Sequence, residues 1–443
     1  AARGRSLGLR TVASWGRIEL PMKDTNRGGG NRKDRDRLTV LSLFTSYGLG
    51  DIGIREAGGD CLVMAEYHAR RCSFLRRNYP DTAVIEGDIG RTKEMIVEEA
   101  RRRLAGDELF LLVATPPCQG ISSNGKGRIN RAVRDGKRPA RDPRNELVLP
   151  ALDVIERLRP RWVVFENVVG MRATEIPYRG RWRPILEVIE ERLGPEYSGK
   201  AEAVNFASYG VPQNRRRLVT VYTRDPNGIA LLREKGGLLP PPTHASPVTL
   251  RQAIGHFDEL DGRSAAVSRH DPFHRVKSVC HYEAVRHTPE GASAFDNGCA
   301  GCGDPNESPA GGRGGPVRPA HCGQCGLRLP RPMIRRNGRW VVTQGFRTSY
   351  KRMAWDKPAP TVTKNFMTPS SDYTLHPGQN RTLSPAEAAT LQTVDRYSYD
   401  WGEKPTDRVL CDALGEAVPP LFFEKLTRHL KEDAPRTLGN FWA

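Results

Sequence analysis

Short apolar runs alternate with longer helical patterns through the first half of the chain, and this alternation limits the possible folds more than any other feature. The expected strands cover residues 38–44, 61–66, 83–86, 109–114 and 162–165. The helix-like stretches between them cover residues 69–78, 93–104 and 145–158. Nearly continuous apolar strands joined by helices predict an α/β fold whose parallel sheet is covered on both faces. Ligands of such sheets bind at the carboxyl ends of the strands, so the residues that follow each strand are the first candidates for function.

The alternation then stops, and the following residues differ in composition. Residues 226–380 are rich in Pro, Gly, His and Arg and show little apolar periodicity, which predicts an inserted, irregular domain. Helical patterns return at residues 384–392, where Ser384 suits the N-cap and Pro385 the first turn. A last helix is expected over residues 421–430. The length of 443 residues allows two or three domains.

Positive charge is in excess along the chain. The formal charge of +18 and the pI near 9.7 favour a polyanionic partner, because neutralised phosphates release counterions. Residues 1–37 hold ten Lys/Arg against four Asp/Glu, so we expect a disordered basic segment, with Met22 as a candidate translation start. No apolar run is long enough to span a bilayer, and no secretory signal is expected. In the reducing compartment this implies, the nine cysteines are expected to be metal ligands, nucleophiles or core residues.

Three groups of polar residues lie where strands end or begin. Cys118 follows the fourth expected strand and two prolines, Glu166 follows the fifth, and Arg215 and Arg217 precede an apolar run at residues 218–222. Taken singly, the cysteine could be a buried apolar residue, the acid a helix cap and the arginines a solvated charge run. Together they predict a thiol, an acid and a guanidinium group on one edge of one sheet.

These strings and their order resemble the cytosine-5 DNA methyltransferase family: Pro-Cys-Gln at Cys118, Glu-Asn-Val at Glu166, and Gln-x-Arg-x-Arg at Arg215 and Arg217. The resemblance covers residues 38–225 and resumes at 381–430, where Arg-Thr-Leu-Ser-Pro is similar to a structural motif of the family. It implies a Rossmann-like class I methyltransferase domain that uses S-adenosyl-L-methionine. It also implies double-stranded DNA as the partner, in restriction–modification or phage defence.

The chemistry explains why these residue types are needed together. C5 of cytosine is a poor nucleophile, and adding a thiolate to C6 creates an enamine whose C5 can attack an electrophilic methyl group. Cys118 would supply the thiolate, and Glu166 would hydrogen-bond N3 and the exocyclic amine. The family's motif implies that Arg215 and Arg217 bind O2 and adjoining phosphates. The target base must be flipped out of the duplex to be reached.

The resemblance also implies a cofactor site made of residues that follow the strands. The residues expected to bind the cofactor are Phe44, Ser46, Gly48, Gly50, Glu66, Asp88, Pro116, Glu416 and Val418. Glu66 would hold the ribose hydroxyls and Asp88 would contact the adenine. Three positions depart from the family pattern: Ser46 and Leu49 stand where glycines are expected, and Glu416 stands in place of Asn. The extra charge at Glu416 could still accept a hydrogen bond from the ammonium group of the cofactor.

Two Cys-x-x-Cys pairs lie within the irregular region. Cys299 and Cys302 are separated by nineteen residues from Cys322 and Cys325. This spacing is typical of a four-cysteine zinc site, whereas incidental pairs or disulfides are disfavoured in a reducing compartment. Four thiolates leave no open coordination position, so we expect a structural Zn²⁺ in a zinc knuckle that stiffens a target-recognition domain.

The expected organisation has four parts. They are a disordered segment at 1–37, a catalytic S-adenosyl-L-methionine-binding domain at 38–225, a smaller irregular target-recognition domain with the zinc site at 226–400, and a C-terminal segment at 401–443 that completes the catalytic domain. We expect a prokaryotic, cytoplasmic, nucleoid-associated protein without membrane contact. It would act as a monomer on DNA, with a cognate restriction or defence complex as a further partner.

Two alternatives remain open at the level of sequence. An RNA cytosine-5 methyltransferase would share the fold and chemistry, although the major RNA family takes its nucleophile from the fifth-strand motif, which here reads Glu-Asn-Val without Cys. A DNA-binding protein with a decayed methyltransferase domain is the second alternative, supported by Ser46, Leu49 and Glu416. The presence of Cys118 and Glu166 speaks against decay.

Overall fold

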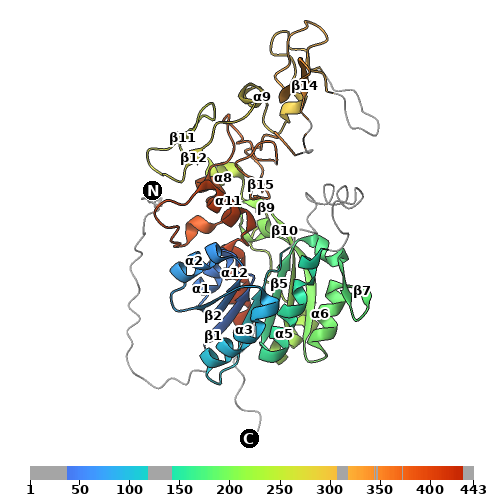
Figure 1. The fold of residues 1–443 in the computed structure, drawn as a ribbon, viewed down its shortest axis with the longest axis vertical. Helices are drawn as coiled ribbons and strands as arrows, with labels where there is room; N and C mark the ends of the chain where they lie inside the picture. The colour runs from blue at the N-terminus through green and yellow to red at the C-terminus, as the bar shows by residue number, and fades with distance from the viewer. Residues whose placement is uncertain are drawn as a thin grey trace, which may run out of the picture.

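The computed structural model describes residues 37–117, 142–306, 318–343, 345, 348–371 and 373–432. The expected disordered segment therefore lies almost wholly outside the described residues. A seven-stranded sheet in the order β3-β2-β1-β4-β5-β10-β8 occupies the lower part of the molecule (Figure 1). Its strands are β1 (Leu38–Leu43), β2 (Gly59–Glu66), β3 (Ala83–Glu86), β4 (Leu111–Ala114), β5 (Trp162–Asn167), β8 (Ser198–Asn205) and β10 (Arg216–Thr223). The predicted α/β class is confirmed.

Helices cover both faces of this sheet. They are α1 (Leu49–Glu56), α2 (Ala69–Asn78), α3 (Ile89–Leu104), α5 (Val148–Leu158), α6 (Ile185–Leu193), α7 (Pro226–Lys235) and α12 (Pro420–Glu432). Alternate residues of β4 enter different cores, with Leu111 and Val113 in one and Leu112 and Ala114 in the other. The first core contains side chains of α1, α2 and α12, and the second those of α3, α5 and α6.

One edge of the sheet corrects the prediction of a parallel sheet. β10 pairs antiparallel with both β5 and β8, whereas the strands from β3 to β5 pair in parallel. The link from β8 to β10 contains only η3 (Phe206–Tyr209) and the two-residue β9 (Gln213–Asn214), and so short a link does not suit a parallel crossover. The sequence of β8 carries no apolar run, which explains why this strand was not expected.

The upper part of the molecule is irregular, as predicted (Figure 1). Its regular elements are short: α8 (Leu250–Ile254), β11 (Ala266–Val267), β12 (Arg275–Val276), α9 (Tyr282–Arg286), η4 (Ala294–Asp296), β13 (Met333–Arg336), β14 (Arg339–Val342) and β15 (Ala359–Pro360).

The remaining elements are η1 (Pro143–Leu147), η2 (Val169–Ala173), β6 (Glu175–Tyr178), β7 (Arg181–Pro184), α10 (Pro385–Leu391), η5 (Val394–Arg396) and α11 (Asp407–Glu416). Within the described ranges, no helix has the length and apolarity needed to cross a membrane.

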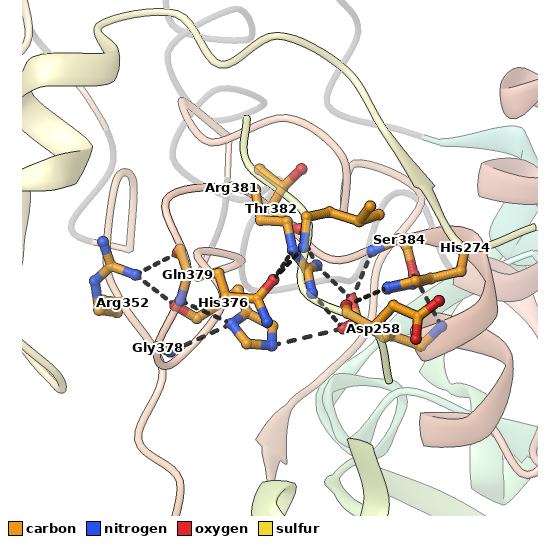
Figure 2. Close-up of polar contacts among 11 residues, drawn as sticks. Asp258, His274, Arg352, His376, Gly378, Gln379, Arg381, Thr382 and Ser384 are labelled. Atoms are coloured by element: carbon orange, nitrogen blue, oxygen red, sulfur yellow. Dashed lines mark hydrogen bonds and ion pairs between the residues drawn. The ribbon is translucent and has the colours of Figure 1, made fainter. Parts of the chain in front are cut away.

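A buried polar cluster connects the irregular part to α10 (Figure 2). Both nitrogens of the Arg381 fork donate to Glu387 at 2.8 Å, and Glu387 also closes a capping box with Ser384. The expected N-cap role of Ser384 is confirmed, and His274 Nδ1 lies 2.9 Å from the same hydroxyl. Arg352 donates to five acceptors in this cluster and its surroundings, among them the backbone oxygen of His376. Such fully paired groups hold irregular backbone in one conformation.

Candidate active site and metal centre

A cavity of about 730 Å³ opens at the carboxyl ends of the parallel strands. It brings together most of the residues predicted for catalysis and cofactor binding. Those that line it are Phe44, Ser46, Gly50, Glu66, Asp88, Pro116, Glu166, Arg215, Arg217, Glu416 and Val418. Gly48 lies at the N-cap of α1 with a φ of 72° and is not among the lining residues. Cys118 lies outside the described residues, directly after Pro117, which lines the cavity.

The loop after β1 turns sharply into α1. Phe44 and Ser46 both have left-handed φ values, 60° and 55°, where a residue without a Cβ is least strained. This conformation explains why the family pattern has glycine at the position of Ser46. The serine in this chain adopts the same left-handed conformation with strain. The Ser46 backbone N–H donates to Glu66 Oε2 at 2.8 Å, which ties the loop to the end of β2.

The two acids expected to contact the nucleoside part of the cofactor both line the cavity. Glu66 accepts hydrogen bonds from the backbone N–H groups of Ser46 and His68, at 2.8 and 3.0 Å. Asp88 is the N-cap of α3 and accepts from the Gly90 N–H at 2.9 Å. Asp88 therefore has a capping role and also faces the cavity, so the two interpretations of this acid are compatible.

Glu416 lies between two cations. Arg71 NH2 is 2.6 Å from one carboxylate oxygen, and Lys364 Nζ is 2.6 Å from the other. The guanidinium group of Arg71 also lies 3.6 Å from Glu66 and over the ring of Tyr47. The extra negative charge at Glu416 is thus neutralised by the chain itself, through residues that sequence reasoning did not single out.

Asp51 is a further cavity residue that the sequence analysis missed. It follows the glycine turn in the first helical turn of α1 and is only 4% exposed. Burial raises the pKa of Asp51 to about 6, and a hydrogen bond with Ser42 opposes this shift. Among the described residues, neither Asp51 Oδ1 nor Ser46 Oγ has a hydrogen-bond partner, although both residues line the cavity. The acid at the helix start was the only signal for this position.

Glu166 and Arg217 form a pair inside the cavity. Arg217 Nε lies 3.0 Å from Glu166 Oε1, and the Glu166 side chain is only 9% exposed. Burial raises the pKa of Glu166, while the nearby charges of Arg217 and Arg215 act in the opposite direction. The acid is therefore placed to hold a proton more readily than an ordinary glutamate does.

Arg215 differs from Arg217 in its contacts. It is 2% exposed, and its guanidinium group donates to the backbone oxygens of Val362 at 3.0 Å and Gly415 at 3.3 Å. These bonds join the strand β9–β10 region to two segments that lie far along the chain. Arg215 lines the cavity and also braces its wall.

Two further contacts build this wall. β15 pairs in parallel with β9, and the side chain of Gln213 accepts from the Val362 N–H at 3.0 Å and donates to the Leu391 oxygen at 2.6 Å. A Cβ at Gly415 would lie 2.1 Å from the backbone nitrogen of Lys364, so only glycine permits this close approach. Segments expected to belong to separate motifs therefore meet at the cavity.

The turn that leads to Cys118 is held from the neighbouring strand. Asn167 donates from its side-chain amide to the Pro116 oxygen at 3.0 Å, and Thr115 donates to the Phe44 oxygen at 3.0 Å. The Glu-Asn-Val string thus contributes a cavity acid through Glu166 and a brace for the proline turn through Asn167.

The four predicted zinc ligands lie together. The Sγ atoms of Cys299, Cys302, Cys322 and Cys325 are all within 4.8 Å of one another. Two of the Sγ–Sγ distances, Cys299 to Cys325 and Cys302 to Cys322, are 3.5 Å. Tetrahedral coordination at a Zn–S distance of about 2.3 Å requires sulfurs about 3.8 Å apart, which this arrangement approaches.

Polar groups also support the four sulfurs. The Gly301 N–H donates to Cys299 Sγ at 3.4 Å, and the Asn306 side chain donates to Cys322 Sγ at 3.2 Å. Arg331 is buried and donates to the backbone oxygens of Asn297 and Asn306, which fixes both ends of the first Cys-x-x-Cys segment. Donors directed at sulfur suit thiolates that hold a metal ion.

Comparison with known proteins agrees with the geometry. The profile of the C-5 cytosine-specific DNA methylase family matches residues 38–432. Type II methyltransferase M1.HgaI of Avibacterium volantium is 29% identical over 399 residues, covering 88% of this chain and 97% of the relative. Type II methyltransferase M1.HphI of Haemophilus parahaemolyticus is 28% identical and covers 88% of this chain and 85% of the relative.

Solved structures show the same fold. The S. pombe Dnmt2 methyltransferase superposes with a TM-score of 0.51 at 12% identity, covering 89% of this chain and 99% of that protein. The Entamoeba histolytica methyltransferase EhMeth gives a TM-score of 0.51 at 10% identity, covering 90% and 98%. The family match spans nearly all of the described residues, and most of the residues that the family resemblance implies line the cavity. The chain belongs to the C-5 cytosine-specific DNA methylase family.

Proposed function

We propose that this protein methylates C5 of a flipped-out cytosine in double-stranded DNA, with Cys118 as the covalent nucleophile. The observation that carries the proposal is the Glu166–Arg217 pair, which lies in the same cavity as the braced proline turn that leads to Cys118. A proton-holding acid and a guanidinium group thus lie in one cavity, and the turn that precedes Cys118 in the sequence lines the same cavity.

Cys118 and Glu166 divide the chemistry between them. The Cys118 thiolate adds to C6 of the cytosine, and Glu166 holds a proton at N3 so that the negative charge of the adduct is neutralised. C5 then accepts the methyl group, the C5 proton is lost to a base, and the C6–S bond breaks to regenerate the thiolate. Arg217 orients Glu166 and would bind O2 of the base, and Arg215 serves mainly to position the wall of the cavity.

The cavity fits S-adenosyl-L-methionine as the methyl donor. When bound, this cofactor supplies an electrophilic methyl group on a positively charged sulfur. Glu66 and Asp88 both line the cavity, where Glu66 would bind the ribose hydroxyls and Asp88 would contact the adenine. The unpartnered Oδ1 of Asp51 and Oγ of Ser46 offer further polar contacts. The volume is in the ordinary range for a small-molecule site, about 300–1,000 Å³.

The irregular part of the chain suits target recognition. We assign residues 226–400 to a recognition domain held by a structural Zn²⁺ on Cys299, Cys302, Cys322 and Cys325, and residues 38–225 with 401–443 to the catalytic domain. The four thiolates leave no position for substrate, so the metal supplies folding energy rather than catalysis. The protein would act as a monomer on DNA in a prokaryotic cytoplasm. A role in a restriction–modification or defence system is supported by the similarity to Type II methyltransferases.

The first test is expression in a bacterial host that lacks cytosine methylation, followed by bisulfite sequencing of the host genome. Methylated cytosines in one short motif are expected, and Cys118→Ser is expected to abolish them. Folded, zinc-loaded protein that methylates no DNA would contradict the proposal. In that case, titration with S-adenosyl-L-methionine separates the alternatives, because binding would favour an RNA substrate and no binding a decayed catalytic domain.

A further inference from the structure

A basic β-hairpin projects next to the cysteine cluster. β13 and β14 pair antiparallel around a two-residue turn, Asn337 and Gly338, whose φ values of 48° and 78° fit the tight turn of a β-ribbon. Figure 1 shows β14 in the upper part of the molecule, away from the large sheet. At the base of the hairpin, Met333 is buried in a small core with two of the metal-site cysteines.

The rest of the hairpin is exposed. Cross-strand partners point to the same face, so Ile334 with Val341 and Arg336 with Arg339 share one face of the ribbon. All four of these residues are exposed, with Ile334 at 37% and Val341 at 42%. The hairpin is therefore anchored by its base and presents a free face and a free tip.

Positive charge gathers on this hairpin. Arg335, Arg336 and Arg339 are exposed, and the exposed Arg328 lies over the ring of Trp340 at 4.5 Å. Within the part of the chain that the structure describes, none of these four arginines is in an ion pair. Guanidinium groups beside an exposed aromatic ring can bind nucleic acid, because the guanidinium groups pair with phosphates and the side chains can contact bases.

A second hairpin in the same chain provides an internal comparison. The tip of β6 and β7 reads Arg-Gly-Arg-Trp, similar to the Arg-Asn-Gly-Arg-Trp tip of β13 and β14, and Trp182 is 56% exposed. There, however, Arg179 lies 2.6 Å from Glu191, and Arg183 lies 3.3 Å from Glu187 on α6. Acidic side chains compensate the charge of this hairpin, whereas among the described residues no acid is ion-paired with an arginine of the β13–β14 hairpin.

We propose that the β13–β14 hairpin is the element that grips double-stranded DNA in a groove, with Arg336, Arg339 and Trp340 as its contact residues. This assignment rests on the proposed function and names the part of the chain that performs recognition. The major groove of B-DNA admits a two-stranded β-ribbon. The cysteine cluster and Arg331 fix the base of the ribbon, so that its tip meets the duplex in one orientation.

The test measures DNA affinity as a function of salt concentration. The double variant Arg336→Ser/Arg339→Ser is compared with Arg233→Ser/Lys235→Ser, which makes the same charge change on exposed residues of α7, beside the amino end of β5. Trp340→Ala is compared with Trp182→Ala. Fluorescence anisotropy on a random-sequence duplex needs no known target, and zinc content and thermal unfolding confirm that each variant is folded.

The hairpin double variant is expected to bind at least about tenfold more weakly. The negative slope of log K against log salt should become shallower by about 1.8, because two phosphate contacts at about 0.9 each are lost. Trp340→Ala should also weaken binding, and both control variants should match the wild type. Unchanged affinity in the hairpin variants, or an equal loss in the α7 control, would overturn the proposal.

Methylation is scored separately. A wild-type protein that binds DNA through the hairpin but methylates none would contradict the proposed function and leave the hairpin assignment intact. A wild-type protein that methylates DNA, with hairpin variants that bind as tightly as it does, would leave the function and remove the hairpin from it. Titration with S-adenosyl-L-methionine should give the same affinity in all variants, because none of these residues lines the cavity.

Discussion

Glu416 stands where the family pattern has asparagine, and its carboxylate lies between Arg71 and Lys364. Both cations line the cavity, and Arg71 also lies near Glu66. The substitution is thus compensated locally: one added negative charge meets two positive ones. Opposing effects also act on the charge of Glu166. Its burial favours the neutral form, while Arg217 and Arg215 favour the charged form.

Removing the charge of Glu416 is expected to weaken cofactor binding. Glu416→Gln leaves Arg71 and Lys364 unpaired beside a cofactor that carries positive charge on its sulfur. We expect the Kd for S-adenosyl-L-methionine, measured by isothermal titration calorimetry, to rise roughly fivefold, about 1 kcal/mol for a partly exposed pair. The double variant Arg71→Met/Glu416→Gln should recover most of this loss. Equal affinities in wild type and Glu416→Gln would show that the pairing has no role in binding.

The pH profile of methylation should report the Glu166–Arg217 pair. If protonated Glu166 is the active form, activity is retained below its pKa and lost as the pH rises through it. Arg217 lowers the pKa of Glu166, so Arg217→Met should raise this pKa. The alkaline limb of the kcat/KM profile should then move to higher pH, even if the maximal rate also falls. Glu166→Gln should reduce kcat by about 10²–10³. An alkaline limb that stays in place in Arg217→Met would assign it to another group.

At the scale of elements, short segments are held by a few specific contacts. The two Cys-x-x-Cys segments converge although neither contains a helix or a strand. α1 and α12 approach so closely that a Cβ at Gly53 would lie 1.9 Å from the Pro420 oxygen. Between α1 and α12 this close backbone approach adds to the apolar core that the two helices share.

Zinc removal should affect the recognition region alone. We expect one zinc per chain by mass spectrometry, and Cys322→Ser should lose it, because a structural site supplies roughly 10–16 kcal/mol of binding free energy to local folding. The variant should become sensitive to proteolysis near residues 299–325 and bind DNA more weakly. Its affinity for S-adenosyl-L-methionine should not change, since no cysteine of the cluster lines the cavity. Cys280→Ser, at an exposed cysteine outside the cluster, is the matched control.

At the scale of the whole molecule, the buried polar cluster of Figure 2 joins the irregular part to α10. His376 is 1% exposed, and its Nδ1 accepts from the backbone N–H groups of Gly378 and Gln379 at 3.2 and 2.9 Å. A proton on Nδ1 would remove both bonds. Burial lowers the pKa of His376 to about 3, against the pull of Glu387 and with further lowering by Arg381, Arg352 and His274.

The free energy of unfolding should therefore fall in mild acid. The unfolded chain binds a proton at His376 near pH 6.5, whereas the folded protein does not until about pH 3, so stability decreases as the pH falls through this window. The slope should approach about 1.4 kcal/mol per pH unit. Below pH ~4.3 the loss should steepen, because the pKa of Glu387 is lowered to about 2 by Arg381, against burial, which raises it.

Urea unfolding between pH 7 and 4.5 measures this effect. His376→Asn should be less stable at neutral pH but should lack most of the slope, while His270→Asn, at an exposed histidine, should keep it. Parallel pH dependences of wild type and His376→Asn would contradict the role assigned to the buried ring.

The sequence alone determined the features that depend on neighbouring residues or on a short repeat. The strand–helix alternation predicted the sheet and its ligand edge, the capping residues predicted the start of α10, and the cysteine spacing predicted the cluster. Periodicity and local hydrogen bonding operate over a few residues, so they can be read directly from the chain.

Only the tertiary structure decided the contacts between distant segments. The antiparallel edge of the sheet, the pairing of β9 with β15 and the part of Asp51 in the cavity carry no local pattern. The contact between Arg71 and Glu416 joins residues 345 positions apart. Such pairs form because folding brings opposite charges or close-packed backbones into one place, and nothing near either residue in the sequence records the partner.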